Sequence, residues 1–267
     1  MSGQWDTCAL CPRLCRTACP VATGSAREAA VPTLIATTIR AHEQGRLPVS
    51  QAIEAATLCT DCGNCAELCH IDRPLPEFLR SFRGEHLAEP AVEPLRPIEG
   101  SGARVAIEAD ERPFAATLAR HLGQSVRRWP TADRLGVALV EHEGWARQAS
   151  ELRRHASTHS LVVADGGVAQ ALEASDISFE WLHQVVRGLP TGAPSCRQEG
   201  RGPLACCGGA GPLATHHPDD ARRVGKLWLD RAEEWKVGDA RCREHLRGCG
   251  ADPTDPLDAL MELVDAG

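Results

Sequence analysis

The 267-residue chain lacks the features of several common protein classes. Lys and Arg are scattered and the formal net charge is −7, so there is no concentrated positive charge to follow nucleic-acid phosphates. No stretch approaches the roughly 18 consecutive apolar residues of a membrane span. We therefore expect no nucleic-acid partner and no transmembrane segment, so that any membrane association would come through a partner protein.

Signals for export and for nucleotide chemistry are also missing. The first residues have neither the basic segment nor the apolar core of a secretory signal, and we expect a cytoplasmic protein. The glycines at 208, 209 and 211 do not have the G-x-G-x-x-G form of a nucleotide site. No spacing of histidine with a nucleophile, or of paired carboxylates, predicts a catalytic site. Flavin or hydride chemistry would therefore belong to a partner.

Three regions differ in composition. Residues 1–88 contain two cysteine groups separated by helix-like stretches, which predicts a small helical domain. Residues 89–102 contain three prolines and two glycines, which predicts a linker or a wrapped connection. In residues 103–267, short apolar runs alternate with helical segments. This alternation predicts an α/β domain with a mainly parallel sheet.

Particular elements follow from local patterns. Apolar runs predict strands at residues 105–108, 136–140 and 161–164. Pro218 followed by two aspartates is typical of a helix start, and a last helix is expected from about residues 254–256. Ser25 and Glu28 have the spacing of a capping box. A helix is expected through Leu34, Ile35, Ile39 and His42, with Pro32 near its start.

Thirteen cysteines are too many to be incidental. A disulfide framework would explain them, but such frameworks are typical of small exported chains with an even number of cysteines. This chain is larger, has no export signal and has an odd number. Reduced thiolates that serve as metal ligands explain the cysteines better.

The second cysteine group has the spacing of a bacterial ferredoxin motif. It contains Cys59, Cys62, Cys65 and Cys69 in the pattern C-x2-C-x2-C-x3-C. Three thiolates on a tight loop can each reach one iron of a cubic cluster, and Gly63 allows the backbone to approach the sulfides. The fourth thiolate leaves on the following segment and typically ligates the other cluster in proteins with two clusters.

The first group is less regular. It contains Cys8, Cys11, Cys15 and Cys19, and it ends in the Cys-Pro pair of the bacterial motif. Its middle gap, however, has three residues instead of two. The second group keeps the regular spacing but has a histidine where the proline usually stands.

Zinc is the alternative metal for these two groups, and the eight cysteines could be divided between two clusters in two ways. Structural zinc sites usually separate two Cys-x2-Cys segments by about 12–20 residues, which neither group does, so iron–sulfur clusters are favoured. If the last cysteines cross, the first cluster is held by Cys8, Cys11, Cys15 and Cys69. The second is then held by Cys59, Cys62, Cys65 and Cys19. In the other arrangement, each group holds its own cluster.

Residues 5–88 resemble the α-helical ferredoxin domain. The eight cysteines carry the resemblance, with Cys59 lying 40 positions after Cys19. This domain occurs in iron–sulfur subunits of succinate dehydrogenase, in the C subunit of anaerobic glycerol-3-phosphate dehydrogenase and in heterodisulfide reductase C subunits. The resemblance implies two [4Fe–4S] clusters. The longer gap between Cys11 and Cys15 looks more like the N-terminal cluster domain of glutamate synthase small subunits.

A second resemblance lies in the C-terminal region. Cys206 and Cys207, followed by two glycines, resemble the Cys-Cys-Gly signature of heterodisulfide reductase B subunits and of glycolate and lactate oxidation iron–sulfur subunits. In those families, an upstream cysteine and a downstream Cys-x2-Cys complete the site of an unusual [4Fe–4S] cluster. Here Cys196 is the upstream candidate, and Cys242 with His245 matches the downstream pair.

This C-terminal match is degenerate. Only nine residues separate Cys196 from Cys206, and the first of the two motifs usual in these families is missing. Two alternatives therefore stay open: a third iron–sulfur cluster, or a Cys-Cys-Gly fold without metal. The candidate ligands of the third site are Cys196, Cys206, Cys207, Cys242 and His245. Cys249 fits no position of the motif.

Together these patterns predict an iron–sulfur electron-transfer subunit. It would pass electrons between a flavoprotein dehydrogenase and a quinone, a disulfide or another carrier, as an oxidoreductase that is active only in a complex. A first alternative is a self-contained disulfide- or quinone-reducing enzyme of heterodisulfide reductase type. A second is a non-redox scaffold or sensor that binds zinc or labile clusters.

Overall fold

The chain forms two compact units in the computed structural model. Unit 1 comprises Met1–Ala88, Cys196–Glu234 and Arg241–Asp252. Unit 2 comprises Glu89–Ser195, Trp235–Ala240 and Pro253–Gly267. The structure describes residues 3–12, 14–87, 95–109, 112–131, 143–173, 175–186, 189, 206–209, 211–231, 240–253 and 255–265.

The division differs from the predicted domains in the C-terminal half. The chain leaves unit 1 at residue 88, where the predicted helical domain ends, but residues 196–234 and 241–252 return to unit 1. The reason is apolar packing. Leu213, Ala221 and Val224 are buried in the same core as side chains of the N-terminal helices. The Cys-Cys-Gly segment thus belongs to the unit that holds the eight N-terminal cysteines.

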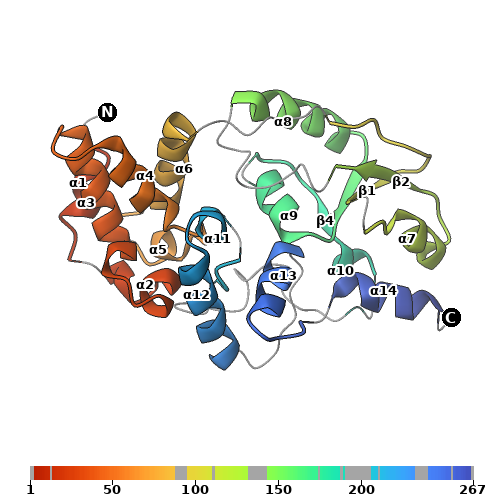
Figure 1. The fold of residues 1–267 in the computed structure, drawn as a ribbon. Helices are drawn as coiled ribbons and strands as arrows, with labels where there is room; N and C mark the ends of the chain where they lie inside the picture. Colours follow the sequence, from red (N-terminus) through yellow and green to blue (C-terminus); the bar gives the residue numbers. More distant parts are fainter. Residues whose placement is uncertain are drawn as a thin grey trace. The chain divides into compact units, whose positions relative to one another are not determined.

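Unit 1 is helical. Its N-terminal part contains α1 (Asp6–Ala9), α2 (Pro20–Gly24), α3 (Pro32–Glu43), α4 (Val49–Thr57), α5 (Asn64–Glu67) and α6 (Leu75–His86), with 3-10 turns at Leu14–Arg16 and Glu28–Ala30. Its C-terminal part contains α11 (Pro212–His216), α12 (Pro218–Arg231) and most of α13 (Ala240–Gly248). Figure 1 shows α12 beside α2, and these two helices pack along each other.

The first long helix begins where the sequence predicts it, at Pro32. α3 starts at Pro32, since proline at the first helical position has the required φ and lacks only an N–H that would be unpaired. Ser25 instead closes α2, where its hydroxyl donates a hydrogen bond to the carbonyl oxygen of Val21 at 2.6 Å. The oxygen of the same hydroxyl accepts the N–H of Arg27 at 3.2 Å, and the 3-10 turn that follows has Arg27 as its N-cap. The predicted capping box at Ser25 is therefore wrong.

Aromatic side chains close the core of unit 1 near the N-terminus. The ring of Trp5 meets Phe78 and Phe82 of α6 edge-on, with centroid separations of 6.0 and 6.2 Å. Its indole Nε1–H donates to Oε1 of Glu43 at 2.7 Å, so the buried ring keeps a polar partner. Four predicted ligands pack against the same core, namely Cys8, Cys19, Cys59 and Cys65.

Unit 2 contains a parallel sheet of four strands. The strands are β1 (Arg104–Glu108), β2 (Val126–Pro130), β3 (Ser160–Val163) and β4 (Glu180–Trp181), in the order β2-β1-β3-β4. β1 and β3 lie where the apolar runs at 105–108 and 161–164 predict strands, whereas the predicted strand at 136–140 lies outside the described residues. β2 and β4 are not predicted by the sequence patterns.

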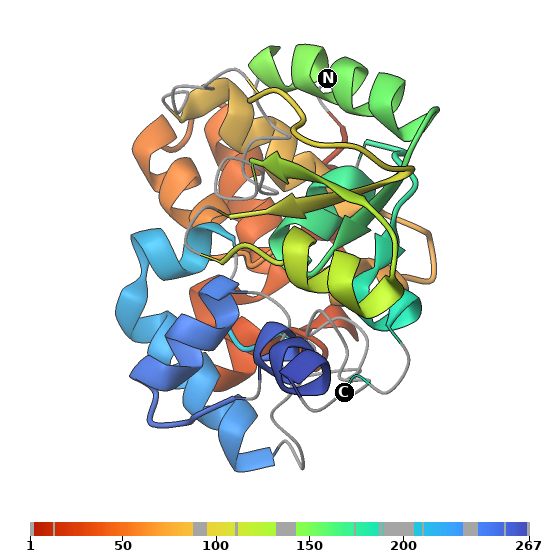
Figure 2. The ribbon, with the colours of Figure 1, turned by 90° about the vertical axis from the view of Figure 1, so that its right-hand side faces the viewer.

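Helices cover both faces of this sheet. They are α7 (Ala115–Leu122), α8 (Glu143–Ala156), α9 (Gly166–Glu173), α10 (Leu182–Val185) and α14 (Pro256–Asp265). Val105 and Ile107 of β1 pack with α8 and α9, whereas the intervening Ala106 packs with α7, α10 and α14. Successive side chains of a strand alternate between faces, so both faces are buried, as is usual in parallel sheets. Figure 2 shows the strands with helices on both sides.

The second half of the predicted linker is bound to the sheet. Glu99 and Arg128 of β2 exchange two backbone hydrogen bonds of 2.9 Å. The indole N–H of Trp129 donates to the carbonyl oxygen of Arg96 at 2.8 Å. Residues 95–99 therefore form a wrapped connection along the edge of unit 2.

The described helices are short. α8 and α12 are the longest of them, with 14 residues each, compared with the roughly 20 residues of a membrane-spanning helix. In the part of the chain that the structure describes, no helix has both the length and the apolar character to cross a membrane.

We expect the buried Glu108 to be a major stabilising residue of unit 2. Its carboxylate accepts the N–H groups of Phe114 and Ala115 at 2.6 and 2.8 Å, at the start of α7, and the Nε–H of Arg128 at 2.5 Å. Glu108→Ala leaves these donors without an acceptor and should lower the free energy of unfolding by about 3 kcal/mol. Denaturant unfolding of the full chain measures this change.

The matched control is Glu99→Ala. Glu99 also pairs with Arg128, at 3.5 Å, but its side chain is 56% exposed. This variant should cost less than about 1 kcal/mol. Equal losses for the two variants would contradict the role assigned to Glu108.

Candidate functional site

Four predicted ligands surround one cavity of unit 1. The cavity has a volume of about 240 Å³ and is lined by Cys8, Cys11, Cys15 and Cys69. Cys65 also reaches its wall. The last cysteine of the second motif thus lies with the first three cysteines of the first motif.

The other four predicted ligands line a second space. Cys19, Cys59, Cys62 and Cys65 surround it, so the last cysteine of the first motif joins the first three of the second. This space is narrow, with about 20 Å³, which is room for roughly one water molecule. A cluster could enter only if the cysteine side chains moved outward. Each space is thus lined by three cysteines of one motif and the last cysteine of the other, and Cys65 lies in both walls.

Two hydrogen bonds hold the motifs against each other. Asn64 of α5 donates through Nδ2 to the carbonyl oxygen of Ala18 at 2.5 Å, directly before Cys19. Arg73 donates through Nη2 to the carbonyl oxygen of Gln4 at 2.7 Å, which ties the chain after Cys69 to the N-terminus. The spacing of the cysteines does not reveal either contact. Together the two hydrogen bonds tie the first motif to the second.

Backbone amides point at several of the sulfurs. The N–H of Ala22 donates to Sγ of Cys19 at 3.5 Å, and the N–H of Arg73 donates to Sγ of Cys69 at 3.4 Å. Cys19 is the N-cap of α2, so its sulfur lies at the positive end of a short helix. Such N–H···S bonds favour the thiolate form, which is the form that ligates a metal.

The loop of the second motif has two left-handed residues. Gly63 has φ +79° and precedes α5, and Asp61 has φ +58°. The carboxylate of Asp61 forms an ion pair with Arg83 of α6 at 2.6 Å, and both side chains are almost fully buried. Sequence reasoning missed this pair. The available signal is that Arg83 lies four residues after Leu79, on the apolar side of α6.

Burial raises the thiol pKa values around the narrower space. It raises the pKa of Cys19 to about 11. For Cys62, burial is again the main cause and the Cys206 thiol adds to it, which together raise the pKa to about 12. The pKa of Cys59 is also raised, by burial and then by the Asp61 carboxylate. Without a positive partner these groups are therefore neutral thiols at pH 7, and metal binding would have to release their protons.

The Cys-Cys-Gly segment, which runs from Cys206 to Gly211, packs closely against helices and against the second cysteine motif. A Cβ at Gly211 would lie 2.9 Å from the carbonyl oxygen of Thr60, between Cys59 and Cys62 in sequence, and Gly211 has φ +71°. A Cβ at Gly209 would lie 2.8 Å from Cβ of His245. The glycines are thus explained by close packing rather than by a phosphate site.

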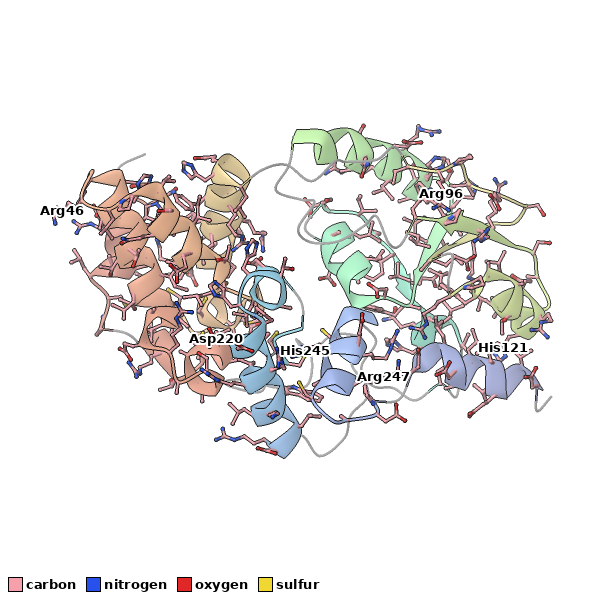
Figure 3. The ribbon with its side chains drawn as sticks, in the orientation of Figure 1. Arg46, Arg96, His121, Asp220, His245 and Arg247 are labelled. Carbon is pink, nitrogen blue, oxygen red and sulfur yellow. The ribbon has the colours of Figure 1, made fainter. Side chains whose placement is uncertain are left out.

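Polar contacts fasten α12 to the N-terminal helices. Arg27 forms an ion pair with Asp220 at 3.1 Å, and Figure 3 labels Asp220 on α12. Nε2 of His217 lies 3.0 Å from the hydroxyl of Thr57, at the end of α4. Burial and the Arg27 charge lower the pKa of His217, so the ring is neutral at pH 7. These contacts hold the Cys-Cys-Gly segment against the second cysteine motif.

Three C-terminal cysteines are buried, and the imidazole of His245 is hydrogen-bonded to backbone carbonyl groups. Cys206, Cys207 and Cys242 are 4%, 0% and 2% exposed, and Cys196 lies outside the described residues. Nε2 of His245 lies 3.0 Å from the carbonyl oxygen of Cys207 and 3.1 Å from that of Ala221. Both partners are acceptors, so Nε2 must carry the proton. In this position Nε2 bridges α13, α12 and the Cys-Cys-Gly segment, and the sulfur of Cys249 lies 3.8 Å from the same nitrogen. Figure 3 labels His245.

Within the described residues, no three His, Cys, Asp or Glu side chains converge on a single metal ion. Thiolates around one zinc ion would lie about 4 Å from each other, given Zn–S bonds of about 2.3 Å. The cysteines instead stand around the walls of two spaces. The four cysteines around the 240 Å³ cavity would suit a larger inorganic core with four iron corners, whereas the narrower space would take one only after its cysteine side chains moved outward.

We expect His245→Ala to destabilise unit 1 without loss of iron. The variant leaves two buried carbonyl oxygens without their donor, at a cost of about 1–3 kcal/mol, while the cysteine ligands stay in place. Denaturant unfolding and iron analysis of the same preparations measure both effects.

His216→Ala is the control, since this side chain is exposed on α11 and its loss should cost less than about 0.5 kcal/mol. Loss of iron from a His245→Ala chain that is as stable as His216→Ala would identify His245 as a ligand and contradict the structural role.

Comparisons with protein-family models, with curated proteins and with solved structures find no match for this chain. The resemblances to iron–sulfur proteins therefore depend on the cysteine motifs themselves.

Proposed function

We propose that the chain is an iron–sulfur electron-transfer subunit with two [4Fe–4S] clusters. The observation that carries this proposal is the sorting of eight cysteines around two spaces that share Cys65 in their walls. Each set combines three cysteines of one motif with the last cysteine of the other. This sorting is expected for a ferredoxin with two clusters, and a structure built around disulfides would have no need of it.

Two bound clusters would supply one-electron carriers placed next to each other. The cysteines would hold the iron, and the N–H groups of Ala22 and Arg73 would stabilise the thiolates of Cys19 and Cys69. Apolar side chains of the unit 1 core pack against four of the cysteines. They would keep water from the sulfurs and so contribute to the reduction potentials.

The C-terminal cysteines favour two clusters over three. Nε2 of His245 is engaged by two carbonyl oxygens. Cys206 lies close enough to Cys19 and Cys62 to influence the pKa of both thiols, so it belongs to the surroundings of the second cluster. In this proposal the Cys-Cys-Gly segment covers that cluster.

The burial of the same cysteines argues against a self-contained disulfide reductase. Cys206 is 4% exposed and Cys207 is fully buried, whereas a disulfide substrate must reach an attacking thiolate. We therefore propose that the chain acts within a complex in the cytoplasm. A flavoprotein dehydrogenase would exchange electrons with it, and a quinone, a disulfide or another carrier would be the second redox partner.

Pairs of cysteine variants test this assignment. EPR spectra of the anaerobically purified, dithionite-reduced chain should contain signals from two clusters. Because Cys8 and Cys69 line one cavity, Cys8→Ser and Cys69→Ser should alter the same signal. Cys19→Ser and Cys59→Ser should both alter the other signal, and each variant should contain about four fewer irons.

Cys249→Ser is the matched control, because Cys249 lies in the same unit but lines neither cavity. It should leave both signals unchanged. If Cys69→Ser and Cys59→Ser altered one and the same signal, the crossed arrangement would be contradicted. If the reduced wild-type chain showed no cluster signal, the proposed function itself would be contradicted.

A further inference from the structure

A buried ion pair lies behind the loop of the second cysteine motif. Arg83 of α6 donates through Nη2 to Oδ2 of Asp61 at 2.6 Å, and the two side chains are 1% and 2% exposed. Nη1 of the same arginine donates to the carbonyl oxygen of Ala56 at 3.1 Å, near the end of α4. Charges are seldom buried to this degree, and then only when they are paired.

Asp61 is joined to the thiol of Cys59 in two ways. Its backbone N–H donates to Sγ of Cys59 at 3.3 Å, a hydrogen bond that a ligating thiolate also accepts. The protonated thiol also donates to Oδ1 of the carboxylate at 3.6 Å. Asp61 also has φ +58°, a left-handed conformation that costs energy in a residue with a side chain. The ion pair with Arg83 holds Asp61 in this conformation and thereby fixes the sulfur of Cys59.

Apolar side chains are buried on the same side of α6. Leu79 and Phe82 on the same helix are 1% and 5% exposed. A buried ion pair is often no more stabilising than well-packed apolar residues of the same size. Stability alone therefore does not account for two full charges placed next to a predicted cluster ligand.

We propose that Arg83 and Asp61 are positioning residues that fix Cys59 and set the reduction potential of the second cluster. The inference depends on the proposed function, because it requires a cluster held by Cys19, Cys59, Cys62 and Cys65. Hydrogen bonds to ligand sulfurs and the local net charge both determine cluster potentials. The pair is shielded from water, so dissolved salt screens it little.

The two charges act in opposite directions. Reduction adds an electron to the site, so a nearby carboxylate disfavours reduction and a nearby guanidinium favours it. Asp61→Asn should therefore shift the midpoint potential of one cluster to a more positive value. Arg83→Met should shift the same cluster to a more negative value, and the double variant should lie between the two. Arg83→Lys keeps the charge and should stay closest to the wild type.

A potentiometric titration followed by EPR tests the proposal on the full chain. The expected result is a pair of opposite shifts in one cluster signal, with the other signal unchanged. Arg46→Met is the control for the loss of a positive charge, because Arg46 is exposed in the same unit (Figure 3). It should leave both midpoint potentials unchanged.

Other outcomes would overturn the proposal. These are unchanged midpoint potentials in both single variants, shifts of the same sign, or loss of the second cluster even in Arg83→Lys, which would indicate a purely structural role. If Arg83→Met loses the second cluster and the other variants keep it, the midpoint potential of Asp61→Asn tests the proposal. A more positive potential supports the proposal, and an unchanged or more negative one contradicts it. A wild-type chain without iron–sulfur signals would instead contradict the proposed function, so the two failures can be distinguished.

Discussion

The convergence of eight cysteine sulfurs in one small unit is the constraint on which the rest of the structure depends. Cys19 lines the same space as three cysteines of the second motif, and Cys69 lines the same cavity as three cysteines of the first, so the two motifs are interlocked. The hydrogen bonds of Asn64 to Ala18 and of Arg73 to Gln4 close this arrangement. The thiols around the narrower space have raised pKa values, and a bound metal would remove their protons. Cofactor binding and the stability of unit 1 are therefore expected to be coupled.

The same constraint explains why the chain returns to unit 1 after its sheet. α12 packs along α2 and bonds to the N-terminal helices through Asp220 and His217, and Gly211 lies against Thr60 in the second motif. The Cys-Cys-Gly segment is therefore a neighbour of the second motif and not the centre of a separate domain. His245 supports this arrangement by donating to two carbonyl oxygens. The buried pair of Arg83 and Asp61 supports the motif from the side of α6.

Sequence patterns predicted the parts of this structure that depend on short-range spacing. The cysteine spacing indicated two sets of four, with an exchange of the last cysteines between the sets as one of two alternatives. Apolar runs located β1 and β3.

Contacts between distant residues were not predictable. The return of residues 196–234 and 241–252 to unit 1 depends on apolar contacts such as that of Leu213 with the N-terminal core. Ser25 had the spacing of a capping residue, but the carbonyl oxygen of Val21 binds its hydroxyl instead. The spacing of Arg83 from Leu79 placed it on the apolar side of α6, but only the fold brings it to Asp61.

The proposed function requires that unit 1 hold two iron–sulfur clusters. Quantification of iron, zinc and acid-labile sulfide per chain, on protein purified without oxygen, tests this requirement most directly. Two [4Fe–4S] clusters predict about eight irons and eight sulfides per chain, with negligible zinc. Zinc without acid-labile sulfide would contradict them.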